Sequence, residues 1–232
     1  MNVEAELDTA NSQQAIAAMQ AADLVIAMSA YKHHATEYAD VLLPIAPFTE
    51  TSGTFVSTEG RVQSFKGAVK PLGEARPAWK VLRVLGNLLK VSGFDQDTSE
   101  AVRDEALKGV DVAAKLNNAI SGVDIKAASA AGGLQRVSDV PIYATDAVVR
   151  RSAPLQATVD AAAPQVWLHS DELKKLGVQS GAMLKVSQGQ GSVSLSAVAD
   201  DKLPKGVVRV AAGHNATAAL GAMFGTITVE RA

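Results

Sequence analysis

The chain has 232 residues, 47% of them hydrophobic, and is therefore long enough to bury a core in one or two modest domains. Its 22 Lys and Arg against 24 Asp and Glu give a net charge of -2, which argues against a protein built to coat nucleic acid or an anionic membrane, since both need surplus positive charge. The sequence contains no cysteine, which excludes disulfides, thiolate-bound zinc, cysteine-ligated iron–sulfur clusters and a cysteine nucleophile from this chain.

The first 45 residues predict the start of an α/β unit. Residues 12–22 place apolar side chains at helical spacing, and Asn11 or Ser12 can cap that helix. The apolar runs 24–28 and 41–43 are typical of strands buried on both faces of a parallel sheet. The polar residues 31–38 between them favour one short helix. Such alternation of helix and strand indicates the α/β class.

The middle of the chain predicts a long loop and then helices. Residues 47–71 carry glycines and many hydroxyl groups, and we expect them to form a loop. A helix follows, with Pro77 in its first turn, and a second is expected over residues 99–115. Residues 117–133 are rich in Ala, Gly and Ser, which favours a connector, with an ordinary surface loop as the alternative.

In the last third of the chain, apolar and polar residues alternate with a period of two. Asp171 is expected to cap a short helix that Gly177 ends. The expected strands cover residues 165–169, 183–188, 193–198, 207–210 and 226–229, the second and third forming a hairpin around residues 189–191. Several short strands with one small helix predict a compact β-barrel.

The histidines offer little metal chemistry. His33 and His34 are adjacent, and neighbours on a helix point about 100° apart, so they rarely bind one metal ion. We expect them to face solvent. His169 and His214 are isolated and are expected at a strand end and in a loop.

Residues 49–63 form the segment richest in hydrogen-bonding groups. Following a buried strand, such a loop can line a ligand crevice of an open α/β sheet. The alternative is that Glu59 and Arg61 merely hold the loop to neighbouring structure. Residues 213–217 form a second polar bend, equally compatible with a site or with plain structure.

The loop over residues 49–63 also carries a family resemblance. Residues 39–44 and 50–63 resemble a hallmark of the molybdopterin oxidoreductase superfamily, Ala-Asp-Val-Val-Leu-Pro followed by Glu-x-x-Gly-Thr-Phe-x-Asn-x-Glu-x-Arg-x-Gln. Ser57 stands where that pattern usually has Asn. Residues 66–87 and 218–225 are similar to the large iron–sulfur subunit of bacterial NADH:quinone oxidoreductase, which is respiratory complex I.

The resemblance implies a fold and a domain plan. It implies a partial molybdopterin-oxidoreductase-type α/β domain with trailing helices over residues 1–116, a linker over 117–134, and a C-terminal double-psi β-barrel over 135–232, of the kind that binds molybdopterin dinucleotide. It also implies that the chain is a fragment, with cysteine-rich cluster domains upstream. Two strands are too few for a self-standing parallel sheet, which agrees with missing upstream partners.

The resemblance assigns no catalytic, cofactor-binding or metal-binding residue to this chain. The iron–sulfur clusters would lie in the missing N-terminal part, and the complex I relatives are generally regarded as having lost the pterin cofactor. Glu59, Arg61, Gln63 and His214 are the candidates for a relic cleft.

Three functions follow as hypotheses. In the first, the chain is a non-catalytic structural part of the large complex I subunit, on the cytoplasmic face of the bacterial inner membrane. Its partners would be other peripheral-arm subunits and the missing upstream domains, with no nucleic acid and no direct membrane insertion. In the second, it is the pterin-binding C-terminal part of a molybdenum-dependent oxidoreductase such as a formate dehydrogenase-like enzyme. In the third, residues 135–232 form a free-standing barrel that binds partners.

Overall fold

The computed structural model describes residues 1–123 and 132–232, which form two compact units. The barrel unit comprises Asn2–Val25, His33–Asp40 and Ala127–Ala232, and the hairpin unit comprises Met1, Ile26–Lys32 and Val41–Lys126. Within the described residues, no helix is both long and apolar enough to cross a lipid bilayer.

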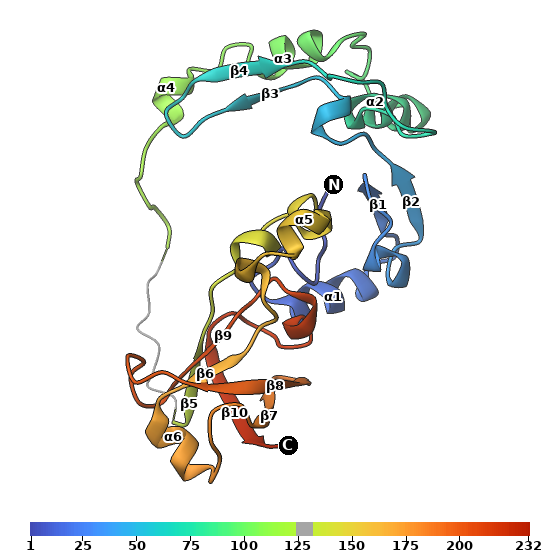
Figure 1. Ribbon diagram of the computed structural model, residues 1–232. Helices are drawn as coiled ribbons and strands as arrows, with labels where there is room; N and C mark the ends of the chain where they lie inside the picture. The colour runs from blue at the N-terminus through green and yellow to red at the C-terminus, as the bar shows by residue number, and fades with distance from the viewer. Residues whose placement is uncertain (124–131) are drawn as a thin grey trace. The chain divides into compact units, whose positions relative to one another are not determined.

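The elements are short (Figure 1). The α-helices are α1 (Ser12–Ala21), α2 (Ala78–Leu88), α3 (Ser99–Ala106), α4 (Val112–Lys115), α5 (Ala153–Gln156) and α6 (Ser170–Lys175). The strands are β1 (Ile26–Ser29), β2 (Val41–Pro44), β3 (Gly53–Val56), β4 (Val62–Phe65), β5 (Leu134–Val137), β6 (Val166–Leu168), β7 (Met183–Gln188), β8 (Gly191–Ala199), β9 (Val207–Val210) and β10 (Gly225–Arg231). The 3₁₀ turns are η1 (His34–Glu37), η2 (Phe48–Glu50), η3 (Ile142–Ala144), η4 (Val149–Arg151), η5 (Val159–Ala161) and η6 (Asn215–Thr217).

Six strands close into a barrel in the order β10-β5-β9-β6-β8-β7, which confirms the predicted β-barrel. The pairs β5–β9 and β6–β8 are parallel, and the other neighbours are antiparallel. Closure leaves no strand at an open edge of this sheet. The double-psi topology and the domain boundaries at residues 116 and 134 stay predictions, and residues 124–131 of the predicted linker lie outside the described residues.

The barrel is filled by the inward half of each alternating strand. Its core cluster consists of Val166, Leu168, Leu173, Leu184, Val186, Leu195, Ala197, Val208, Val210, Leu220, Ile227 and Val229. Full burial of a Val or Leu side chain contributes about 1.5–3 kcal/mol. The hairpin β7–β8 pairs Gln188 with Gly191, and its two-residue turn places Gly189 at φ 58°, which only glycine adopts without strain. The interior is therefore a packed core.

The N-terminal helix is fastened to the barrel unit. Ser12 Oγ lies 2.8 and 2.6 Å from the carbonyl oxygens of Ala218 and Leu220, so its single proton is shared between them. Gln13 Nε2 donates to the carbonyls of Gln188 and Ala219 at 2.8 and 2.9 Å. Helix α1 is therefore hydrogen-bonded to the β7–β8 turn and to the loop before β10.

The prediction that residues 24–28 and 41–43 pair in a parallel sheet is confirmed, but their burial is not. Strands β1 and β2 form a two-stranded parallel sheet in register from Ile26–Val41 to Ser29–Pro44. Ile26, Val41 and Leu42 are exposed, whereas Met28 is buried. A two-stranded sheet has no further strands or helices to cover both faces.

The prediction of a loop over residues 47–71 is wrong. Strands β3 and β4 form an antiparallel hairpin there, with Phe55 stacked on Phe65 at 5.4 Å between ring centroids. Gly60 makes the turn possible with φ 81°. The strands have four residues each, and their hydroxyl-bearing residues interrupt the alternation of apolar and polar side chains that marks a strand.

The prediction of one helix over residues 99–115 is also wrong. Helix α3 ends at Ala106 and α4 begins at Val112. Gly109 adopts φ 72° between them, and the Asp111 side chain accepts from Ala114 N at 3.1 Å, which starts a new helix.

Local signals at the other helices give mixed results. Asn11 caps α1 as predicted, through its side chain and the N–H of Gln14. At α6 the cap is His169 instead of Asp171, because the His169 Nδ1 accepts from the N–H of Asp171. Of the short helix predicted over residues 31–38, the turn η1 forms.

Candidate functional site

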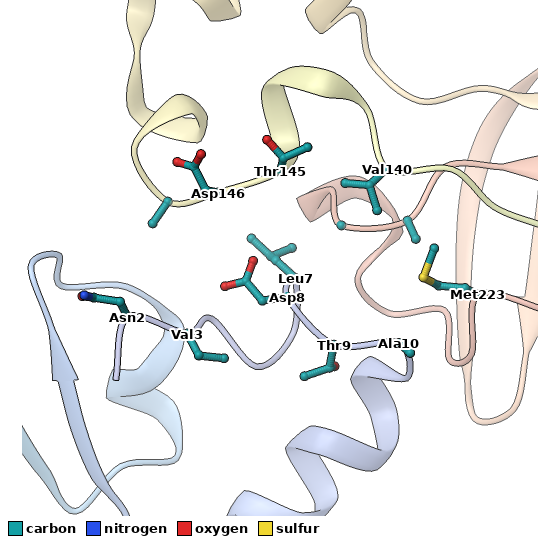
Figure 2. A pocket seen from close by; sticks show the side chains of 13 residues that line it. Asn2, Val3, Leu7, Asp8, Thr9, Ala10, Val140, Thr145, Asp146 and Met223 are labelled. Carbon is teal, nitrogen blue, oxygen red and sulfur yellow. The ribbon is translucent and has the colours of Figure 1, made fainter. Parts of the chain in front are cut away.

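One cavity of the barrel unit, the aspartate cavity, has a volume of about 380 Å³ (Figure 2). Its wall comes from the N-terminal segment and from three loops of the barrel unit. The lining residues are Asn2, Val3, Leu7, Asp8, Thr9, Ala10, Val140, Thr145, Asp146, Ala147, Ala212, Gly213 and Met223. Two carboxylates therefore face a mostly apolar space.

Both carboxylates of this cavity already have structural partners. Asp8 Oδ1 pairs with Arg150 at 2.9 Å, and its Oδ2 accepts from the N–H of Glu4 at 2.8 Å. Asp146 Oδ1 accepts from the N–H groups of Val148 and Val149 at 2.7 and 3.0 Å. The aspartate cavity thus offers few uncommitted polar groups to a ligand.

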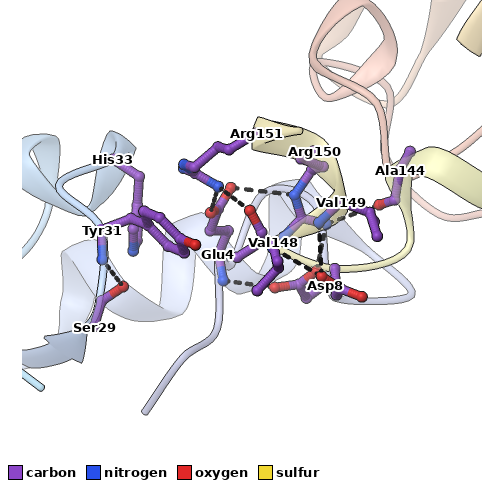
Figure 3. Close-up of polar contacts among 12 residues, drawn as sticks. Glu4, Asp8, Ser29, Tyr31, His33, Ala144, Val148, Val149, Arg150 and Arg151 are labelled. Atoms are coloured by element: carbon purple, nitrogen blue, oxygen red, sulfur yellow. Dashed lines mark hydrogen bonds and ion pairs between the residues drawn. The ribbon is translucent and has the colours of Figure 1, made fainter. Parts of the chain in front are cut away.

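Beside it, a partly buried ionic network connects the N-terminal segment to η4 (Figure 3). Glu4, 4% exposed, pairs with Arg151 at 2.6 Å and with Arg150 Nε at 3.5 Å. Arg150 also donates to the carbonyl of Ala144 at 2.8 Å. Glu4 and Arg150 are its shielded pair, and removing one partner of a buried pair typically costs about 3–5 kcal/mol because the other charge is left uncompensated. This network, the Glu4–Arg150 clamp, therefore connects the N-terminal segment to η4.

The second cavity of this unit, the Glu6 cavity, has a volume of about 280 Å³. It is lined by Glu6, Ile16, Gln20, His34, Glu37, Tyr38, Asn215, Ala218 and Ala219. His34 Nδ1 lies 2.8 Å from Glu37 Oε1, and that hydrogen bond, aided by nearby carboxylate charges, raises the pKa of His34. Burial raises the pKa of Tyr38, and the Glu6 carboxylate adds to the rise. The site favours positive charge.

Arg136 is a buried cation inside the barrel. It donates to the Gln188 side chain at 2.7 Å and to the carbonyls of Ala222 and Ala211 at 3.1 and 3.2 Å. Burial lowers the pKa of Arg136 to about 10. Its terminal nitrogens are committed to the barrel, so Arg136 is a structural tie between β5 and the loops that follow β9 and precede β10.

The residues predicted for a relic cleft fall in both units. Glu59, Arg61 and Gln63 lie in or beside the turn of the β3–β4 hairpin, where all three are exposed and Arg61 Nε pairs with Glu59 Oε2 at 3.2 Å. The two side chains pair with each other within the turn, so this contact does not hold the loop to neighbouring structure. His214 belongs to the barrel unit, where burial lowers its pKa.

Three of the histidines share one role. The Nδ1 atoms of His33, His169 and His214 each accept from the backbone N–H two residues further on, at 3.0–3.1 Å. Each thereby starts a helical turn. Over residues 1–123 and 132–232, no three His, Asp or Glu side chains gather as a metal site requires.

Sequence reasoning misses the charged residues that line the cavities or form the buried contacts of the barrel unit. In the sequence Glu4, Glu6 and Asp8 are simply an acidic start, and nothing singles out Arg136 or Arg150. Their contacts join segments more than 50 residues apart, as in the ion pair of Asp8 with Arg150 and the bond of Arg136 to Gln188. No local pattern reports such contacts.

Two segments of the chain match known protein families. Residues 1–88 match the molybdopterin oxidoreductase family, and residues 142–230 match the molybdopterin dinucleotide binding domain. The two matches follow one another along the chain in this order.

Curated relatives share sequence with part of this chain, and a solved structure shares its fold. Two relatives from Staphylococcus aureus, each named "Putative formate dehydrogenase", are 39% identical over 79 residues and 36% identical over 89 residues. The matched parts are 34% and 38% of this chain but 8% and 9% of those relatives. The structure of acetylene hydratase from Pelobacter acetylenicus has the same fold over the whole chain, with a TM-score of 0.68, 15% identity and 44% of its own length covered.

The aspartate cavity and the Glu6 cavity do not fit a molybdopterin dinucleotide. That cofactor carries a diphosphate, and proteins bind phosphates with Arg, Lys or clustered backbone N–H groups. Neither Arg nor Lys lines the aspartate cavity or the Glu6 cavity, and each is lined by two carboxylates. We therefore assign no residue of either cavity to that cofactor.

Proposed function

We propose that this chain is the C-terminal part of a molybdopterin-type oxidoreductase related to the formate dehydrogenase-like proteins. The observation that carries the proposal is the order of the two family matches, residues 1–88 and then 142–230, within one chain. The chain spans 8–9% of its curated relatives in the matched parts, so catalysis is proposed for the whole protein.

In this proposal the chain's own residues provide a scaffold. The closed barrel, the Arg136 ties and the Glu4–Arg150 clamp give a rigid body on which other parts of the protein assemble. A molybdopterin dinucleotide supplies oxidation–reduction chemistry in such enzymes. Cationic groups for its diphosphate are proposed to come from outside the two cavities of the barrel unit.

The test uses the full-length protein purified under exclusion of oxygen. Molybdenum is measured by mass spectrometry, the pterin by fluorescence after oxidation, and activity by formate-dependent reduction of a viologen dye. Stoichiometric metal and pterin with dye reduction supports the proposal. A full-length protein without both metal and pterin contradicts it.

A second candidate is the structural C-terminal part of the complex I large subunit, on the cytoplasmic face of the membrane. Residues 66–87 favour it through their similarity to that subunit, and the acidic cavities agree with a chain that holds no pterin. Its proposed partners are the peripheral-arm subunits. Co-purification of the full-length protein with an NADH-oxidising, iron–sulfur-containing assembly supports it, and migration as a free protein contradicts it.

A further inference from the structure

The turn η6 begins with a hydrogen bond to the side chain of His214. The backbone N–H of Ala216 donates to His214 Nδ1 at 3.0 Å. The carbonyl of His214 accepts from the N–H of Thr217 at 2.9 Å and from the Thr217 hydroxyl at 3.2 Å. Both ring nitrogens of a protonated histidine are donors, so the bond from Ala216 requires a neutral ring with its proton on Nε2. The turn therefore depends on the neutral form of His214.

The turn η6 leads into the carbonyl groups to which α1 is attached. Thr217 is buried, and its carbonyl accepts from the N–H of Leu220 at 3.0 Å. This bond orders the backbone over residues 218–220. Ser12 Oγ lies 2.8 and 2.6 Å from the first and last of these carbonyl oxygens, and Gln13 Nε2 donates to the middle one at 2.9 Å. A change in η6 therefore reaches the groups that hold the start of α1.

The surroundings of His214 favour its neutral form. Its side chain is partly buried, and this burial lowers its pKa below the ordinary 6.5. The neighbouring elements bring titratable groups to the two cavities that Gly213 and Asn215 help to line. Those groups are Glu6, Asp8, His34, Glu37, Tyr38 and Asp146. Burial, and none of these charges, is the cause of the shift at His214.

We propose that His214 makes the attachment of α1 to the barrel unit sensitive to acid. Protonation turns Nδ1 into a donor that faces the N–H of Ala216, so the bond that begins η6 is lost. Its stabilisation is present above pH 6.5, the ordinary value, and is lost as the pH falls through the lower folded-state value. The bridge between Asn11 and Ala222 lies outside η6, so the loosening is confined to α1. The inference goes beyond either candidate function.

The first test is nuclear magnetic resonance on the complete 232-residue chain. Nitrogen chemical shifts should show the His214 proton on Nε2 near neutral pH, and a titration midpoint below 6.5. Amide hydrogen exchange is read as protection relative to an unstructured peptide at the same pH. Protection over residues 15–21 of α1 should fall at least about fivefold between about pH 7.5 and about pH 5, the size expected for one lost cap.

The midpoint of this fall identifies the titrating group. It should coincide with the titration of His214, whereas the pKa of His34 is raised by its bond to Glu37. Constant protection of α1, a midpoint that follows His34, or a His214 proton on Nδ1 at neutral pH overturns the proposal.

The second test uses variants of the histidines. His214→Asn keeps a side-chain oxygen that accepts from the N–H two residues further on but does not titrate, so α1 protection should be equal at both pH values. His214→Ala has no acceptor and should lower protection at both. The controls are His34→Gln, beside the same turn, and His169→Asn, which caps α6 with the same bond. Both controls should retain the wild-type fall.

A fall that persists in His214→Asn, or that disappears in either control, contradicts the proposal. Where His214→Asn does not fold, the comparison of the His214 and His34 midpoints in the wild type decides.

Discussion

The barrel unit and the hairpin unit bury their apolar residues to very different degrees. The barrel unit holds a core of twelve residues, ten of them on strands of the closed barrel and two, Leu173 and Leu220, on α6 and the loop before β10. In the described part of the hairpin unit, the buried apolar side chains are those of Met28, Ile45 and Ala46. Its Leu72 and Leu88 are 82% and 75% exposed. A closed sheet completes a core by itself, whereas a strand pair and a hairpin do not, so stability should be concentrated in the barrel unit.

The largest expected effect is the loss of a core side chain. Leu184 is fully buried in the barrel, and Leu184→Ala should lower the free energy of unfolding by about 2–5 kcal/mol through lost burial and a cavity. Val84→Ala, on an exposed face of α2, should change it by less than about 0.5 kcal/mol. Urea denaturation followed by far-UV circular dichroism measures both. Equal losses would break the distinction between the units.

Overpacking where β8 meets the loop before β10 should come next. A Cβ on Gly191 would clash with the Ala219 carbonyl oxygen, so Gly191→Ala should cost about 1–3 kcal/mol as the backbone moves apart. At Gly132 an added Cβ meets nothing within 4 Å, which makes Gly132→Ala the matched control. Thermal melts compare the two, and an unchanged midpoint for Gly191→Ala would show that β8 and the Ala219 backbone are not packed this closely.

Helix caps offer a closer comparison of the two units, because each unit has an N-terminal helix cap with the same hydrogen-bond distance. The side chains of Asn11 and Asp111 each accept from a backbone N–H at 3.1 Å. Asn11→Ala should destabilise the barrel unit by about 1 kcal/mol, because α1 is part of its packing. Asp111→Ala should affect just the four-residue α4. Amide hydrogen exchange across the barrel strands reads out the difference, and equal exchange rates in the two variants would contradict it.

The smallest effect concerns an exposed ion pair of the barrel unit. The hydrogen bond from Arg209 lowers the pKa of Asp139 below its ordinary 3.8. The stabilisation is therefore present above pH 3.8 and is lost as the pH falls through the folded-state value. Both side chains are about half exposed, so the pair contributes at most about 1 kcal/mol.

The measurement is the stability difference between the wild type and Asp139→Asn, by urea denaturation at neutral pH and near pH 3. The difference should shrink in acid. A difference that stays constant or grows would show that the Asp139–Arg209 pair contributes nothing through its charge.

Local patterns predict the barrel better than the hairpin unit. The β7–β8 hairpin combines a period of two with a glycine-bearing turn, and both signals agree. The β3–β4 hairpin has four-residue strands that are mostly exposed, so no apolar alternation marks it. The break at Gly109 lies inside an apolar pattern that is still typical of a helix.

The cavities lie beyond sequence reasoning for a different reason. Glu6, His34 and Asn215 line one cavity although they come from three distant segments. Each is ordinary within its own segment. The family resemblance draws attention to Glu59 and Arg61, yet the structure gives them an exposed contact with each other. Convergence of distant polar groups is a property of tertiary packing and has no signature in local spacing.

The attachment of residues 2–25 to the barrel bears on how this architecture can be inherited. A gene segment encoding residues 135–232 alone would leave the carbonyls of Ala218 and Leu220 without Ser12, and Arg150 without Glu4 and Asp8. Recombination that transplanted the C-terminal segment into another protein would thus have to carry the distant N-terminal segment with it. Transfer of the barrel segment alone to another protein should accordingly be rare in evolution, although its strands are contiguous in the sequence.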